Sequence, residues 1–314
     1  MLTYLVKRFL SIIPVLFGIS VVSFTLIHLV PGDTVSVILG TNTTAVSAAT
    51  LRAAFGLDRP APVQYVMWLG GVLHGDFGQS FITGQPIFST IMYRLPASAE
   101  LTAAAMLLSL CIALPTGVLA AIRQYSVADY AGTTLALLGL SLPSFWLATM
   151  LTIVFSVMWH LLPPAGFVPF PADPLGNLRD LILPAVALGT GLAAVVMRYT
   201  RSAMLEVVRQ EYIKTARLKG LPERMVIAKH ALKNALMPVV TVIGLQTAYL
   251  LGGVVIIEQI FEWPGVGKLL LNAVYQRDYP LVQGVILVVA TLFVLINLIV
   301  DILYAYLNPR IHYA

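Results

Sequence analysis

One stretch of the sequence comes close to a nucleotide-binding loop. The residues from Trp263 to Leu270 read Trp-Pro-Gly-Val-Gly-Lys-Leu-Leu, and glycines followed by lysine are what a phosphate-binding P-loop uses. A P-loop requires Gly-x-x-x-x-Gly-Lys-Ser/Thr, because the hydroxyl after the lysine holds magnesium. Here Glu262 stands where the first Gly should be, and Leu269 follows Lys268. The stretch is not a P-loop, and we expect no enzymatic activity in this chain.

The side chains that usually bind metals or act as nucleophiles are scattered along the sequence. No His-Glu-x-x-His pattern is present, and Cys111, the only cysteine, lies inside an uncharged run, so neither a thiolate cluster nor a disulfide is possible within the chain. The five histidines are widely separated: His28, His74, His160, His230 and His312. We therefore expect no catalytic residue, no metal site and no cofactor bound by this chain.

The composition is that of a membrane protein. Of 314 residues, 59% are hydrophobic and only 11% are charged, and the mean hydropathy is +0.89. Six runs without Asp, Glu, Lys or Arg, at 9–30, 101–122, 130–162, 181–197, 235–257 and 279–300, can each cross a bilayer as a helix, which takes about 20 residues. These runs are apolar throughout, unlike the short alternating segments of a transmembrane β-barrel. The sequence predicts an all-α membrane protein with six transmembrane helices at 9–30, 97–122, 130–162, 181–200, 235–257 and 279–305.

The positions of Lys and Arg predict the orientation of these helices, because short cytoplasmic loops are enriched in both residues. The basic residues Lys7, Arg8 and Arg123, the dense set from Arg198 to Lys233, and Arg310 collect on one side. We expect that side to be cytoplasmic, with both termini, in a bacterial-type inner membrane. The cytoplasmic segments are then 1–8, 123–129, 201–234 and 306–314, and the extracytoplasmic segments are 31–96, 163–180 and 258–278.

The extracytoplasmic segments contain two further features. Segment 31–96 is long enough for a small external subdomain, with helix-like pieces at Ala45–Phe55 and Val63–Leu73. The segment after Glu258 offers the aromatic residues Phe261, Trp263 and Tyr275. These aromatic residues could form a belt at the membrane interface or a docking surface for an external partner.

The one sizeable cytoplasmic feature is the basic segment 201–234. Helix-forming residues run from Ser202 to Lys219, Gly220 stands where a left-handed helix cap is needed, and Pro222 is placed to begin a second helix that ends near Asn234. We call this expected helix-glycine-helix turn the elbow. Three functions are open to it: a helix-turn-helix DNA reader, an anchor to anionic lipid, or a docking element for a soluble partner. Docking is favoured, because the adjoining spans hold the elbow against the membrane and it is longer than orientation requires.

A few polar and small residues interrupt the apolar helices. Gln246, Tyr249, Glu258, Asn297 and Asp301 could line a translocation path or bond neighbouring helices. A stripe of small residues on the fifth helix could let another helix approach closely, and we expect it to contact a second membrane subunit: Gly244, Ala248 and Gly252. Pro115, Pro143 and Pro184 could kink their helices.

Several motifs in order resemble the permease subunits of ATP-binding-cassette (ABC) importers, in the dipeptide, oligopeptide and nickel branch. They are PGD at 31–33, GLDRP at 56–60, GDFGQS at 75–80, TRSAMLEV at 200–207, EYIKTARLKGLPERMVIAKHALKN at 211–234, FEWPGVG at 261–267, RDYP at 277–280 and NPRI at 308–311. The resemblance covers nearly the whole chain and is closest to the B-type dipeptide permeases. It implies the type I ABC-importer permease bundle.

The resemblance also implies a role for the elbow. Importer permeases carry Glu-Ala-Ala, three residues, Gly, nine residues and Ile-x-Leu-Pro in a loop that docks on the cytoplasmic ATPase. Here that pattern falls on Lys214 to Ala216, on Gly220 and on the segment from His230, with Glu, the first Ala, Ile and Pro replaced. The residues expected to couple to the ATPase are Thr215, Ala216, Lys219, Gly220, Leu221, His230 and Asn234. Among these, Leu221 is expected to fill an apolar spot on the partner.

The sequence therefore predicts a transmembrane subunit of an ATP-driven importer that moves di- or oligopeptides into the cytoplasm. The resemblance implies as partners a homologous second permease, one or two cytoplasmic ABC ATPases that bind ATP and magnesium, and an extracytoplasmic peptide-binding protein. The alternative is an ion-coupled secondary transporter. It is less favoured, because no ionisable group lies near the middle of a span and no repeat relates the two halves.

Overall fold

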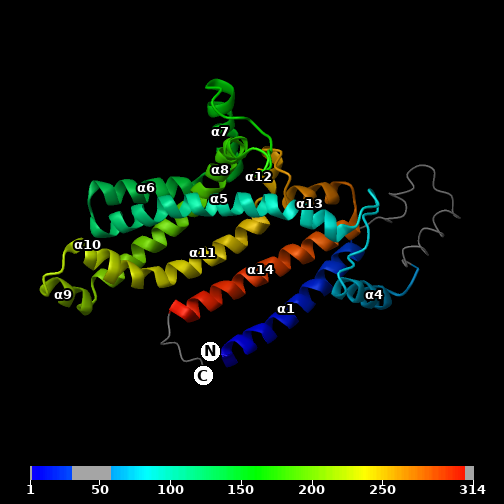
Figure 1. The fold of residues 1–314 in the computed structure, drawn as a ribbon, viewed down its shortest axis with the longest axis horizontal. Coiled ribbons are helices and arrows are strands. Elements are labelled where there is room, and N and C mark those ends of the chain that lie inside the picture. Colours follow the sequence, from blue (N-terminus) through cyan, green and yellow to red (C-terminus); the bar gives the residue numbers. More distant parts are fainter. Residues whose placement is uncertain (1, 30–57, 308–314) are drawn as a thin grey trace. The chain divides into compact units, whose positions relative to one another are not determined.

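The computed structural model of the protein describes residues 2–29 and 58–307, which form helices joined by short loops (Figure 1). These residues divide into two compact units. The first comprises residues 99–263 and 295–307, and the second comprises residues 2–29, 58–98 and 264–294. The helix expected at Ala45–Phe55 lies outside the described residues. The helix expected at Val63–Leu73 is present as α4 (Ala61–Leu73).

Helices occur at all six expected positions in the described part of the chain, and five of them are long and apolar enough to cross a membrane. Five pass by length and composition, within α1 (Leu2–Leu29), α5 (Ile87–Ile122), α8 (Pro174–Val208), the stretch 223–247 and α14 (Tyr279–Leu307). The third expected span is a bent pair. It comprises α6 (Val127–Ser141), α7 (Ser144–Leu151) and the π-helical turn η2 (Thr152–Met158). Five single helices and one bent pair thus correspond to the six predicted spans.

The bend in the third span lies at Pro143. The axes of the two helical parts differ by 99°. Leu142 is extended, with φ −83° and ψ 120°, because the proline ring excludes the helical conformation from the residue before it. The sequence indicated a kink at this proline, but the single uninterrupted span expected at 130–162 is wrong.

Two helices begin earlier than the sequence predicted. α5 begins at Ile87 rather than at 97, because Ile87 and Ile91 are fully buried against Val266 and Leu281. α8 begins at Pro174 rather than at 181. The carboxylate of Asp173 accepts a hydrogen bond from the backbone N of Leu175 at 3.1 Å, and proline suits the first helical position.

The first unit packs around α8, which contacts α6, α7 and α11 (Lys233–Gly253). Its core is rich in alanine, and glycines bring backbones together. A Cβ atom on Gly117 would lie 2.8 Å from the carbonyl oxygen of Met197, and one on Gly189 would lie 2.9 Å from that of Ala105. The close approach of α5 and α8 therefore requires these two glycines, as in other membrane helix pairs.

The aromatic residues after Glu258 lie mostly inside the first unit. Phe261 and Trp263 are fully buried, and Gly166 donates its backbone N–H to the carbonyl oxygen of Phe261 at 3.0 Å. The Phe167 and Trp263 rings pack edge to face with centroids 4.7 Å apart. The expected belt or docking role is therefore wrong for Phe261 and Trp263, because both side chains are in the core. Tyr275 is 76% exposed, so a role in an interface belt or in docking stays a prediction for this residue.

The second unit brings two of the quoted motifs together. The fully buried carboxylate of Asp278 accepts hydrogen bonds from the hydroxyl of Ser80 and from the backbone N of Phe81, the latter at 3.1 Å. Ser80 Oγ also accepts from the backbone N of Thr83 at 3.0 Å. Asp278 immediately precedes α14, where a helix N-terminus favours negative charge. The GDFGQS and RDYP motifs thus form one buried polar contact.

Candidate functional site

The elbow lies between α8 and α11 in the first unit, as Figure 1 shows. α8 ends at Val208, and the extended conformation of Gln210 separates it from α9 (Glu211–Leu218). The continuous helix expected from Ser202 to Lys219 is therefore two helices. Ile213 and Ala216 lie three residues apart, and both are buried in the alanine-rich core beside Val226 and Ala231. α9 is held on the unit by this apolar face.

The turn after α9 confirms the predicted glycine cap. Gly220 has φ +76°, a conformation that side chains with a Cβ atom rarely adopt, and its backbone N donates to the carbonyl oxygen of Arg217 at 2.9 Å. A Cβ atom at Gly220 would meet nothing within 4 Å. Glycine is therefore favoured here by the backbone conformation and not by lack of space within the chain.

The second arm of the elbow runs on into the membrane helix. Pro222 precedes the short helix α10 (Glu223–Met225), as expected, but the helical path continues through the π-helical turn η3 (Val226–Leu232) into α11. The predicted end near Asn234 is wrong. The buried residues Val226, Ala231 and Ala235 hold this path in the core all along its length. The elbow is thus joined to α11 without a flexible linker.

Polar contacts connect the two arms of the elbow. Arg217 donates to the Glu223 carboxylate through Nη2 at 2.7 Å and Nε at 3.1 Å. The carboxylate beside it raises the pKa of Arg217, so this guanidinium stays charged. Asn234 Nδ2 donates to the Tyr212 hydroxyl at 2.9 Å and to the carbonyl oxygen of His230 at 2.8 Å. Asn234, one of the predicted coupling residues, therefore connects the second arm to Tyr212 of α9, while His230 takes part through its backbone carbonyl oxygen.

The outward face of α9 differs from the sequence expectation. Thr215 and Lys219 are exposed, but Leu221 is half-buried and packs on the alanine-rich core, and Ala216 also points inward. The apolar side chain that faces outward is Leu218, which is 88% exposed. Leu218 lies two residues beyond Ala216 and so on the opposite side of the helix, which faces outward because Ala216 is buried.

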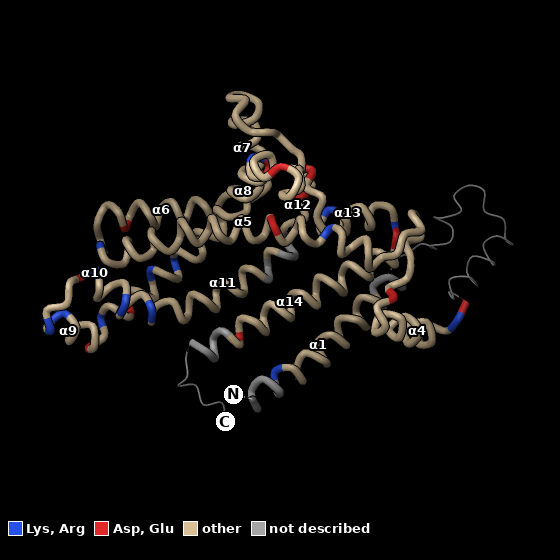
Figure 2. Tube along the Cα trace, in the orientation of Figure 1, with Lys and Arg blue, Asp and Glu red and all other residues tan. Residues whose placement is uncertain are grey.

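The surface around the elbow is basic. Figure 2 shows Lys and Arg gathered on α9, α10 and the adjoining ends of α8 and α11. Residues 206–234 contain seven Lys and Arg and three Glu, a formal difference of +4. All seven basic side chains are exposed. The elbow therefore presents one exposed leucine within a positively charged surface.

An ion pair that the sequence analysis missed connects α6 to α8 near the elbow. Arg201 donates to both carboxylate oxygens of the buried Asp129, through Nε at 2.6 Å and through Nη2 at 2.8 Å. The same carboxylate accepts from the backbone N of Tyr125 at 3.0 Å. Arg201 lies in the TRSAMLEV motif, but nothing in the sequence pairs it with a residue 72 positions earlier. The contact fixes the part of α8 from which the elbow extends.

The residues predicted for the translocation path lie on three helices of the first unit. Gln246 on α11 is half-buried, Glu258 on α12 (Val255–Ile260) is fully buried, and Asn297 and Asp301 are half-buried, one turn apart on α14. The side chain of Tyr249 lies outside those described. A role of these residues in the path stays a prediction.

The stripe of small residues on α11 is described only at its first position. A side chain at Gly244 would overlap Val300 of α14, so this glycine allows a close contact within the chain. The surroundings of Ala248 and Gly252 lie outside what the structure describes. Contact of the stripe with a second permease therefore stays a prediction.

The membrane-length helices and the elbow that joins two of them define a helical, multi-pass membrane protein. A family described as "Binding-protein-dependent transport system inner membrane component" matches residues 113–313, and its N-terminal counterpart matches residues 1–102. The chain belongs to this family. It is therefore a multi-pass inner-membrane component of a binding-protein-dependent transport system.

Curated relatives match over the full length of the chain. It is 44% identical to the dipeptide transport system permease protein DppB of Alkalihalophilus pseudofirmus, with 100% of both chains covered. It is 42% identical to DppB of Escherichia coli, covering 100% of this chain and 99% of that protein. It is also 42% identical to the oligopeptide transport system permease protein AppB of Bacillus subtilis, again with 100% of both covered.

A solved structure shares the fold. The inward-facing MetNI methionine ABC transporter matches with a TM-score of 0.58 at 17% identity, covering 71% of this chain and 99% of that one. At this identity the match concerns the fold alone. The bundle is that of type I ABC-importer permeases.

Proposed function

We propose that this chain is the permease subunit of an ATP-driven importer that moves di- or oligopeptides into the cytoplasm, and that it is driven by ATPase subunits bound at the elbow. The observation that carries the proposal is the full-length similarity to dipeptide and oligopeptide permeases. The elbow supports it, because a rigid turn joined directly to a membrane-length helix can transmit movement of a bound partner.

The proposal includes the partners and the orientation. ATP and magnesium bind to the cytoplasmic ATPases, and this chain binds no cofactor. A second, homologous permease completes the path, and an extracytoplasmic binding protein delivers the peptide. The basic elbow and both termini face the cytoplasm, which the concentration of Lys and Arg around the elbow supports.

The coupling surface follows from the exposed residues of the elbow. Leu218, 88% exposed, is the most exposed large apolar side chain of the elbow, and Tyr212 and Met225 are each 43% exposed; a large apolar side chain in a basic surround is the pattern of an anchor residue that fills a pocket on a partner. Thr215 and Lys219 lie beside it, and Gly220 lets the turn approach closely. We assign to Ala216 and Leu221 the role of holding α9 on the core behind this surface.

The test compares two substitutions at Gly220. Gly220→Glu and Gly220→Ala place the same unfavourable φ on a residue with a Cβ atom, but only Glu adds a long charged side chain to the surface. We expect Gly220→Glu to assemble with the second permease but to lose ATPase binding and peptide uptake, while Gly220→Ala keeps most of both. The measurements are recovery of the ATPase with the tagged chain and ATP-dependent uptake of a labelled dipeptide in proteoliposomes. Normal uptake by Gly220→Glu would contradict docking at the elbow.

A further inference from the structure

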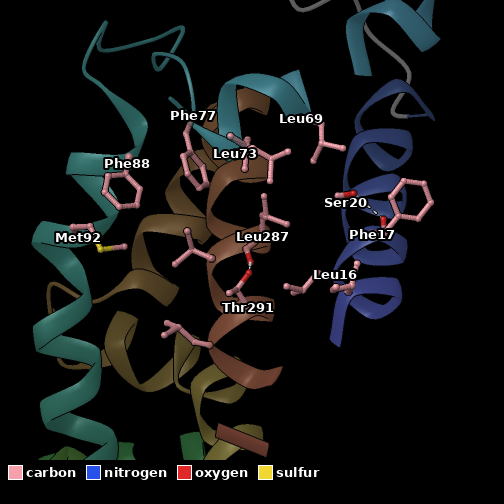
Figure 3. A pocket seen from close by; sticks show the side chains of 14 residues that line it. Leu16, Phe17, Ser20, Leu69, Leu73, Phe77, Phe88, Met92, Leu287 and Thr291 are labelled. Carbon is pink, nitrogen blue, oxygen red and sulfur yellow. Dashed lines mark hydrogen bonds between the residues drawn. The ribbon is translucent and has the colours of Figure 1, made fainter. Parts of the chain in front are cut away.

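A cavity of about 540 Å³ lies within the second unit. Figure 3 shows the side chains that line it, from α1, α4, the start of α5 and α14. Twelve of the 14 lining residues are apolar, and examples from the four helices are Phe17, Leu73, Met92 and Leu287. Its volume falls within the range of about 300–1,000 Å³ that is typical of small-molecule sites. The proposed function above assigns no role to it.

The two polar residues in the lining are already hydrogen-bonded. Ser20 Oγ donates to the carbonyl oxygen of Phe17 at 2.7 Å and is bonded to the Tyr65 hydroxyl at 2.8 Å. Thr291 Oγ1 donates to the carbonyl oxygen of Leu287 at 2.7 Å. The lining therefore offers a ligand no free hydroxyl proton. Water needs two to four polar partners in a buried site, and a peptide must satisfy its backbone groups, so both are disfavoured as occupants.

Several of the side chains that line the cavity also belong to the exposed surface of α1. Only 11% of the membrane-length part of α1 is buried, and its lining residues Ile13 and Phe17 are 63% and 57% exposed. On α4, Leu73 is 77% exposed. In a bilayer, the medium around the exposed Ile13 and Phe17 side chains, at the depth of a spanning helix, is lipid hydrocarbon. The cavity thus extends that lipid-facing surface inward between α1 and α14.

We propose that this cavity binds one acyl chain of a membrane phospholipid. The acyl chain fills the space between α1, α5 and α14. Its van der Waals contacts with these helices hold α1 against the rest of the second unit, because such packing stabilises helix association in membranes. An aromatic group marks the headgroup end. Tyr65 and Trp68 of α4 pack on Phe24 of α1 with centroids 5.3 Å and 6.1 Å away, and Tyr and Trp favour the boundary between membrane and water.

The test uses the whole chain, assembled with its partner permease, in nanodiscs that contain a phospholipid with a diazirine in the middle of one acyl chain. After illumination, labelled peptides are mapped by mass spectrometry. We expect label on Leu287 and Thr291, which face the cavity in Figure 3, as well as on the exposed outer side of α1. Leu287 is buried among protein side chains, so lipid reaches it only through the cavity.

A matched pair of variants separates the cavity from the general lipid surface. Leu16 lines the cavity, whereas its neighbour Val15 is exposed and does not. Leu16→Trp should fill the space and abolish labelling of Leu287 and Thr291, while Val15→Trp should leave that labelling unchanged. Labelling of the outer side of α1 serves as the internal control for folding and insertion.

Three results would overturn the proposal. The first is the absence of label on Leu287 and Thr291 in the unsubstituted chain when α1 is labelled. The second is equal labelling of both residues in the two tryptophan variants. The third is label in the isolated chain that disappears on assembly, which would assign the cavity to the second permease. None of these results depends on ATP or uptake, so the lipid site and the transport function are tested separately.

Discussion

The elbow and the contact between Ser80 and Asp278 are both polar features beside a glycine-containing turn, but they place charge in opposite environments. In the elbow, Arg217 and Glu223 pair at the surface, with side chains 39% and 52% exposed. At the other site, the carboxylate of Asp278 is fully buried and accepts from Ser80 and Phe81. Each feature occurs in a different compact unit.

The difference shows that a charged side chain can contribute either to a binding surface or to the stability of the fold, depending on its exposure. An exposed charge remains solvated when the other member of its ion pair is removed, so it can form part of a docking surface while contributing little to the free energy of unfolding. A buried carboxylate depends on its donors, so its loss leaves polar groups without partners. Substitutions in the elbow should therefore affect partner binding, while substitutions at Asp278 should affect folding.

The largest effect is expected for Asp278→Ala. The substitution leaves the Ser80 hydroxyl and the backbone N of Phe81 without their acceptor, which should lower the free energy of unfolding by about 3 kcal/mol. Asp76→Asn is the control, since Asp76 is an exposed carboxylate in the same segment that accepts from Gly78 N at 2.9 Å. Thermal unfolding in mild detergent should show a clear shift for the first variant and little for the second. Equal shifts would remove the distinction between buried and exposed charge.

An intermediate effect is expected for Asp129→Asn. This carboxylate is buried, but Arg201 retains 26% exposure of its side chain and can recover water. We expect a loss of about 2 kcal/mol, since hydrogen bonds to charged groups contribute roughly that much. Arg209→Ala provides the comparison, because Arg209 makes one long contact of 3.4 Å to Gln124 at the surface. An unfolding temperature for Asp129→Asn as high as that of Arg209→Ala would show that the ion pair does not hold α8.

The smallest effect is expected at the surface pair of the elbow. A double-mutant cycle with Arg217→Ala and Glu223→Ala should give a coupling energy below about 1 kcal/mol, decreasing with added salt. Thermal unfolding at low and high salt measures it. A coupling of several kcal/mol that is insensitive to salt would mean that the elbow depends on this pair for its structure.

Local signals in the sequence predicted much of the fold. Helix length follows from uncharged runs, the cap at Gly220 follows from the residue type between two helical stretches, and the break at Pro143 follows from the proline ring. Each of these depends on neighbouring residues only. Their approximate positions were therefore available without tertiary information, although the extent of the bend was not.

The remaining features depend on contacts between distant residues. Ser80 and Asp278 are 198 positions apart, and Asp129 and Arg201 are 72 apart, so no local pattern relates them. The early start of α5 depends likewise on burial of Ile87 and Ile91 against later helices. In the candidate site, whether Leu218 or Leu221 faces the partner depends on which side of α9 packs against the core.

The most direct test of the central claim is photo-cross-linking from the elbow in the assembled importer. A photoreactive amino acid is placed at Leu218 and, as a control, at Leu137, an exposed apolar residue of α6. We predict ATPase cross-linked to the permease from position 218 and not from position 137. A complex that imports peptide but gives no ATPase cross-link from position 218, or gives the same yield from position 137, would contradict docking at the elbow.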